Sequence, residues 1–176
     1  GKKMNFYKYD AFISYRHTKP DKAVAERLHR LLETFKIPKS IVKSSGKKRI
    51  NRVFRDQEEL PTSSDLAENI TRALESSEYL IVICSPRTKQ SQWVLKEIDT
   101  FKKLHGQDKI LALLIEGEPN ESFPEQLRII NETQTMEDGS IIESTVEVEP
   151  LAADIRAASE KEMFKKLRNE SLRLLS

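Results

Sequence analysis

The chain has 176 residues, and its 30 Lys and Arg nearly balance its 28 Asp and Glu, so the formal net charge is only +2. A charge this small does not by itself argue for a nucleic-acid partner, and we predict none. A chain of this length buries roughly 70% of its unfolded surface. The single cysteine excludes a disulfide framework and a cysteine-rich zinc site, and no apolar run approaches the ~18 residues of a membrane span.

These features, with no signal peptide at the start, predict one cytoplasmic globular domain over residues 1–176. We expect residues 1–6 to be a tail or a cloning remnant, and the domain to be cut from a longer protein. The five glycines are too scattered for a GxGxxG turn or a phosphate-binding P-loop.

Strand and helix patterns alternate along the chain. The predicted strands lie at 9–15, 50–54, 79–84, 110–115 and 145–151. Four helices are predicted. One follows Pro20, one follows the capping residues Ser63 and Ser64, one covers about 91–105 and ends before Gly106, and one covers 160–175. The stretch 117–144 is polar and predicted to be irregular, with one helical turn after Pro124.

Two of the strands, 79–84 and 110–115, are apolar without alternation. Continuous apolar strands have both faces covered, which is typical of a parallel sheet between helices. The pattern therefore predicts an α/β fold with a doubly wound five-stranded parallel sheet, strand order 2-1-3-4-5, and helices on both faces. Ligands of such sheets bind beyond the carboxyl ends of the strands, at the switch point.

The most informative pair is Trp93 and Glu97, which lie four residues apart on the third helix and so share a face. The row continues to Phe101 and Leu104, and no Lys or Arg lies three or four residues from Glu97. Most helical glutamates simply face water. A carboxylate on an aromatic row could instead sit in a partly dry pocket, where it would stabilise a developing positive charge.

Other chemistry-bearing residues support weaker interpretations. Arg16, after the first strand, could bind an anion or be an ordinary exposed arginine. The acids at 56, 58 and 59 favour a solvated loop or a mobile gate over a metal site, and we predict no metal. Cys84 is expected to be a buried core thiol, and the basic connection 36–49 a solvated insertion rather than a phosphate or acidic-lipid contact.

Four segments resemble the Toll/interleukin-1 receptor (TIR) domain, of a bacterial type, in content, order and spacing. They are YDAFISYR at 9–16, VFRD at 53–56, YLIVICSP at 79–86 and SQWVLKE at 91–97. The resemblance covers residues 7–175, and the run EPLAADIR at 149–156 is common in prokaryotic members.

The resemblance implies a flavodoxin-like sheet and one of two functions. The first is an NAD⁺ glycohydrolase that cleaves the nicotinamide–ribose bond, giving nicotinamide and either ADP-ribose or a cyclic isomer, in bacterial immune signalling. The second is a non-catalytic scaffold for contacts between TIR domains. The resemblance also implies a gate loop at 55–64 and Glu97 as the catalytic residue. It implies that the substrate-binding residues are Tyr15, Arg16, Asp56, Leu66 and Trp93.

The expected partners are therefore NAD⁺, as substrate rather than cofactor, and other TIR domains through self-association. Nicotinamide leaves a cationic ring as a neutral group, so no acid need protonate it. A single carboxylate at Glu97 can stabilise the ribosyl cation or hold the ribose hydroxyls. If Trp93 and Arg16 are exposed in the crevice, replacing either with alanine should leave the fold intact.

Overall fold

The computed structural model describes residues 7–34, 52–57 and 66–174 of the chain. The basic connection 36–49 and most of the predicted gate loop, residues 58–64, lie outside the described residues. The structural statements below therefore concern the described ranges.

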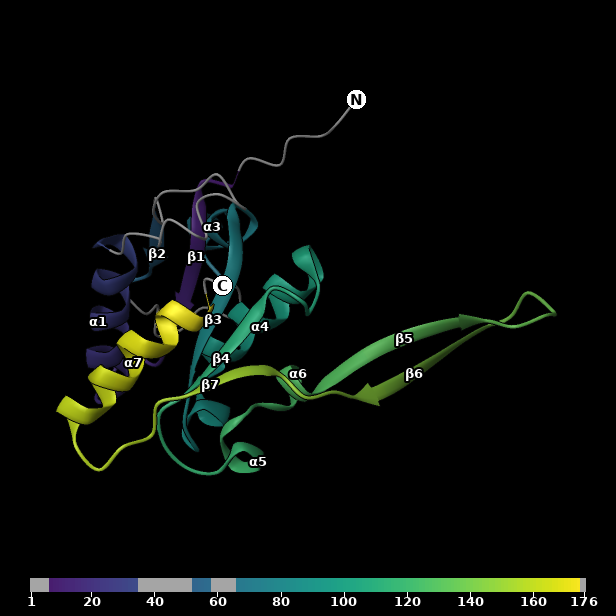
Figure 1. Ribbon diagram of the computed structural model, residues 1–176. Helices are drawn as coiled ribbons and strands as arrows, with labels where there is room; N and C mark the ends of the chain where they lie inside the picture. The colour runs from purple at the N-terminus through teal and green to yellow at the C-terminus, as the bar shows by residue number, and fades with distance from the viewer. Residues whose placement is uncertain (1–6, 35–51, 58–65, 175–176) are drawn as a thin grey trace.

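A five-stranded sheet forms the centre of the molecule, with the order β2-β1-β3-β4-β7 and parallel pairing throughout. Its strands are β1 Tyr9–Ser14, β2 Val53–Arg55, β3 Ser77–Cys84, β4 Ile110–Leu114 and β7 Leu151–Asp154. The predicted doubly wound topology is confirmed (Figure 1). The chain leaves β1 for β2 on one side and then crosses to β3 on the other, so the switch point lies between β1 and β3.

Helices cover both faces of this sheet. The long ones are α1 Asp21–Thr34, α3 Glu68–Glu75, α4 Gln92–His105 and α7 Glu160–Leu174. The short ones are η1 Thr88–Gln90, α5 Pro119–Ser122 and α6 Glu125–Arg128. Within the described part of the chain, no helix combines the length and the apolar character that crossing a membrane requires.

Successive residues of β1 point to opposite faces of the sheet and so build two separate cores. Ala11 and Ile13 pack with α1 and α7, whereas Phe12 packs with α3 and α4. Every residue of β4 is buried, which confirms that the unalternating apolar runs are strands covered on both faces. Cys84 is buried as expected, and burial raises the pKa of its thiol.

The prediction for residues 117–151 was partly wrong. A helical turn follows Pro124 as predicted, but the supposed irregular stretch contains an antiparallel hairpin of β5 Ile129–Thr135 and β6 Ile141–Glu147. The bounds of the strand predicted at 145–151 were wrong, because residues 145–147 end β6, which pairs with β5 and not with the sheet. The fifth strand of the sheet is the short run after Pro150, because proline cannot donate a hydrogen bond to a sheet ladder.

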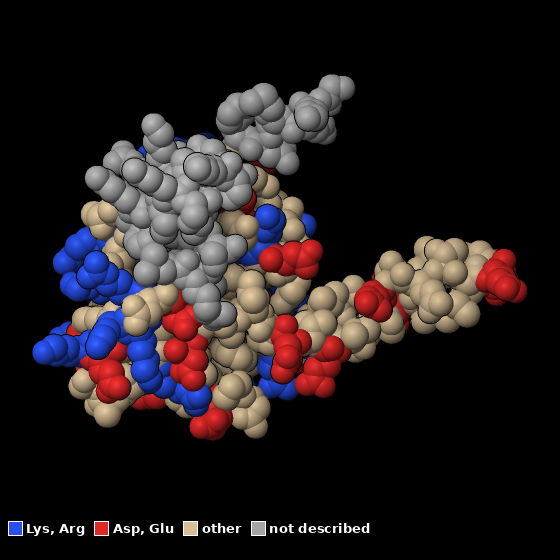
Figure 2. Space-filling view, viewed as in Figure 1, with Lys and Arg blue, Asp and Glu red and all other residues tan. Residues whose placement is uncertain are grey.

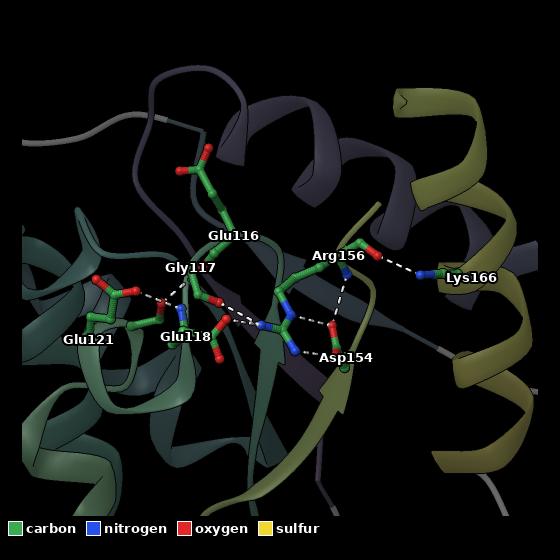
Figure 3. A network of polar contacts seen from close by, with 8 residues as sticks. Glu116, Gly117, Glu118, Glu121, Asp154, Arg156 and Lys166 are labelled. Atoms are coloured by element: carbon green, nitrogen blue, oxygen red, sulfur yellow. Dashed lines mark hydrogen bonds and ion pairs between the residues drawn. The ribbon is translucent and has the colours of Figure 1, made fainter. Parts of the chain in front are cut away.

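A network around Arg156 fixes the end of β7 against the neighbouring elements (Figure 3). Its guanidinium donates two hydrogen bonds to the carboxylate of Asp154, at 2.9 and 2.7 Å, and one to the carbonyl of Gly117 at 3.0 Å. Lys166 of α7 donates to the carbonyl of Arg156. The Arg156 hydrogen bond lowers the pKa of Asp154. The EPLAADIR run thus supplies both the edge strand and the contacts that hold it.

Gly117, in the loop after β4, combines a left-handed backbone with a close contact. Its φ is +79°, and a Cβ atom there would lie 2.5 Å from Cγ of Pro86 in the loop after β3. Gly106, which ends α4, has a similar φ of +83°, but a Cβ atom there would meet nothing within 4 Å.

We therefore expect Gly117→Ala to lower the free energy of unfolding by about 2–5 kcal/mol, from backbone strain and overpacking together. Gly106→Ala, the matched control, should cost only about 1–2 kcal/mol, from backbone strain alone. Urea unfolding of both variants measures the difference, and equal losses would contradict the contact with Pro86.

Candidate functional site

Helix α4 presents the two residues that the sequence singled out. Ser91 caps it, since its Oγ accepts a hydrogen bond from the Val94 amide at 3.3 Å. Trp93 and Glu97 then fall one turn apart on the buried face, with exposed fractions of 7% and 1%. The expected row ends at the buried Phe101, because Leu104 is 42% exposed.

Glu97 is held at the carboxyl end of β1. The Ser14 hydroxyl, on the last residue of that strand, donates a hydrogen bond of 2.7 Å to Glu97 Oε1, and Ser14 itself is fully buried. A carboxylate oriented in this way lies beside the switch point, where ligands of such sheets bind. Of the two alternatives left open for Glu97, the structure supports the dry surrounding and not the water-facing one. Sequence reasoning did not identify Ser14 as its partner.

Aromatic rings connect the first loop to α4. The ring of Tyr15 stacks on His17 with 4.4 Å between centroids, and His17 meets the edge of Trp93 at 6.3 Å. Within the described ranges, no hydrogen-bond acceptor reaches the buried indole N–H of Trp93. The sequence offered no signal for His17, because stacking depends on where the first loop turns.

Tyr15 also connects the first loop to the end of β2. Its hydroxyl donates a hydrogen bond of 2.6 Å to the backbone carbonyl of Asp56 and accepts one of 3.3 Å from Arg55. Burial raises the pKa of Tyr15, although Arg55 opposes the effect. The contact from Tyr15 to Asp56 therefore involves the main chain of Asp56, while its half-buried side chain stays at the same edge of the sheet.

Arg16 forms an ion pair within the protein, which its sequence position did not indicate. Its guanidinium donates to both carboxylate oxygens of Asp21, at 3.3 and 3.0 Å, and Asp21 is fully buried at the start of α1. Burial raises the pKa of Asp21, and the nearby Arg16 partly offsets this. Only 18% of the Arg16 side chain is exposed, so an anion would have to share this cation with Asp21.

Four of the six predicted site residues lie close together in the structure. The structure brings together Tyr15, Asp56, Trp93 and Glu97, from the segments that follow β1 and β2 and from α4, at one edge of the sheet. Leu66 lies just before α3 and packs half-buried against the core on the same face as α4. The condition that Trp93 be exposed in the crevice is not met, because its large ring packs into that core.

Comparison with known protein families identifies the domain. A family model described as the TIR domain matches residues 11–141, which is most of the chain and includes the last four residues of β1, all of α4 and the residues of the site. The chain belongs to the TIR-domain family. This TIR domain is 35% identical, over 111 residues, to a protein of Actinoplanes sp. named NAD(+) hydrolase ApTIR. The match covers 63% of this TIR domain but only 14% of that protein's length.

Two solved structures resemble this TIR domain more distantly. The TIR domains of the activated Roq1 resistosome, which recognises the pathogen effector XopQ, superpose with a TM-score of 0.47 at 19% identity, over 64% of this chain and 61% of that one. A flavodoxin-like domain from a Synechococcus sp. protein superposes with a TM-score of 0.45 at 12% identity, over 93% and 94% of the two chains.

Proposed function

We propose that this TIR domain cleaves NAD⁺ at the bond between nicotinamide and ribose. The observation that carries the proposal is the buried carboxylate of Glu97, held by Ser14 at the carboxyl edge of the sheet. The 35% identity with a protein named NAD(+) hydrolase supports the same substrate, although this chain spans a small part of that protein.

The chemistry needs one well-placed negative charge. As the glycosidic bond breaks, nicotinamide departs as a neutral molecule and positive charge develops on the ribosyl carbon. The Glu97 carboxylate stabilises that charge, and its low-dielectric surroundings make the stabilisation stronger than it would be in water. The indole N–H of Trp93 is a hydrogen-bond donor beside it, available for an oxygen of the substrate.

Water then attacks the ribosyl cation to give ADP-ribose, or the adenine attacks it to give a cyclic isomer. The experiment is to incubate the purified chain with NAD⁺ and to separate nicotinamide, ADP-ribose and cyclic products by chromatography. Release of nicotinamide supports the proposal, and the second product decides between hydrolysis and cyclisation. No nicotinamide at high protein concentration with a crowding agent would overturn it.

A specific observation favours a second candidate, the non-catalytic scaffold. Glu97 and Trp93 are 1% and 7% exposed, so a substrate could reach them only after the surrounding residues move. In a scaffold both residues would remain buried, and the exposed helices would make the contacts. The assay for nicotinamide separates the two functions, because a scaffold gives none under any condition.

If the site opens only when copies assemble, activity should rise faster than linearly with protein concentration. We expect the specific activity to increase severalfold between nanomolar and tens of micromolar chain, because a neighbouring copy would hold the gate loop 55–64 open. Nicotinamide release measured across that range tests this expectation. A rate strictly proportional to concentration would contradict it. A role in bacterial immune signalling is part of the proposal and requires the rest of the protein for its test.

A further inference from the structure

The β5–β6 hairpin, here called the arm (residues 129–147), extends away from the body of the molecule (Figure 1). It is attached at its base, where Lys102 of α4 donates hydrogen bonds to the carbonyls of Gln126 and Ile129, at 2.7 and 2.9 Å. From residue 131 to residue 146 every position is exposed. A two-stranded hairpin alone in water is at best marginally stable, so an extended arm of this kind would gain stability by packing against a partner.

The two faces of the arm differ in character. The cross-strand pairs Ile130–Val146 and Gln134–Ile142 fall on the same face, since side chains alternate along each strand. On this face Val146 and Ile142 are 37% and 48% exposed. Ile141, which is 67% exposed, pairs with Thr135 on the opposite face. One face therefore carries three apolar residues, Ile130, Ile142 and Val146, and the other carries two, Ile129 at the base of the arm and Ile141 near its tip.

The arm is also strongly acidic. Its charged residues are Glu132, Glu137, Asp138, Glu143 and Glu147, with no Lys or Arg between residues 129 and 147. Figure 2 shows the extended arm in red and tan without blue. Two such arms would repel each other edge to edge, because like charges facing across strands are destabilising. The charge equally disfavours an anionic membrane or a nucleic acid, and it favours a basic partner.

A groove of matching character lies between α1 and α7. Its volume is about 560 Å³, and its lining includes the apolar Leu31 and Phe164. Four basic residues surround it, namely Arg27, Lys161, Lys165 and Arg168, against one acid, Glu162. The guanidinium of Arg27 lies over the ring of Phe164, 5.4 Å from its centroid. The groove thus combines apolar walls with a positive rim.

The dimensions agree as well. Ile142 and Val146 are separated by ~14 Å along an extended strand, and Lys161 and Arg168 by ~11 Å along a helix. The arm points away from α1 and α7 in Figure 1, so it cannot fill the groove of its own chain. We propose that the arm of one copy docks its apolar face into the α1–α7 groove of a second copy. Such contacts are head-to-tail, so successive copies extend an open chain or close into a ring.

This inference concerns association and does not depend on cleavage of NAD⁺. Its test is the molar mass of the 176-residue chain in solution, measured by sedimentation velocity up to several hundred micromolar. The parent should show a mass that rises with concentration and association that weakens in salt. Ile142→Asp in the arm and Lys165→Glu at the groove should each weaken association at least tenfold. Ile141→Asp adds the same charge on the opposite face, so it is the matched control and should associate nearly as the parent does.

Mixing the two defective variants gives the sharpest result. Ile142→Asp retains an intact groove and Lys165→Glu retains an intact arm, so an equimolar mixture should form dimers that grow no further. Circular dichroism of each variant checks that it is folded. The proposal is overturned if the parent stays monomeric, if Ile141→Asp is as defective as Ile142→Asp, or if the mixture of folded variants stays monomeric.

Discussion

Glu97→Gln is expected to lower the rate of nicotinamide release from NAD⁺ by about 10²-fold or more, as when one preorganised electrostatic contact is lost. Glutamine keeps the shape and the oxygen that accepts the Ser14 hydrogen bond, but it removes the charge that faces the ribosyl cation. The assay measures nicotinamide over time at one fixed protein concentration, chosen so that the copies are assembled.

The same substitution should also cost a little stability. At 1% exposure Glu97 is not the surface residue that its helical position suggested, and a hydrogen bond to a carboxylate becomes a weaker one to an amide. We expect a loss of about 1 kcal/mol in the free energy of unfolding. Asp99→Asn removes the same charge from an exposed position on α4 and should leave both activity and stability unchanged. If Glu97→Gln releases nicotinamide at the parent rate, the mechanism is wrong.

Trp93→Ala should have the largest effect on stability, about 3–5 kcal/mol, because the indole packs into the core between the sheet and α4. For a chain of this size that loss lowers the melting temperature by roughly 10 °C. Differential scanning calorimetry measures the change. Leu104→Ala, on the same helix but 42% exposed, is the matched control and should shift the melting temperature far less.

The outcome for Trp93 distinguishes two roles of its ring. A large loss of stability with little residual activity fits a ring that supports the site from within the core. A melting temperature within about 2 °C of the parent, with weakened NAD⁺ binding, would instead indicate a wall of an open crevice and would contradict the burial seen here. Comparing the variant with Glu97→Gln separates loss of folding from loss of chemistry.

Local patterns in the sequence were sufficient for most of the architecture. The unalternating apolar runs at 79–84 and 110–115 predicted strands covered on both faces, and the Trp93–Glu97 spacing placed both residues on one buried face of α4. Both signals arise from residues close in the sequence, since strand and helix periodicity depend only on the local backbone. The hairpin was missed because its strands are exposed and polar, so burial left no clear period in 129–135.

Only the tertiary structure decided the contacts between segments that are distant in the sequence. Ser14 and Glu97 are 83 residues apart, and their hydrogen bond exists because parallel pairing brings the end of β1 beside α4. The same is true of Tyr15 with Asp56, of Arg16 turned toward Asp21 instead of a free anion site, and of the depth at which Trp93 lies. The sequence by itself determined most of the elements and which residues share a face of each, because those properties follow from spacing. It did not determine what each buried polar group meets there, because that depends on the packing of the whole fold.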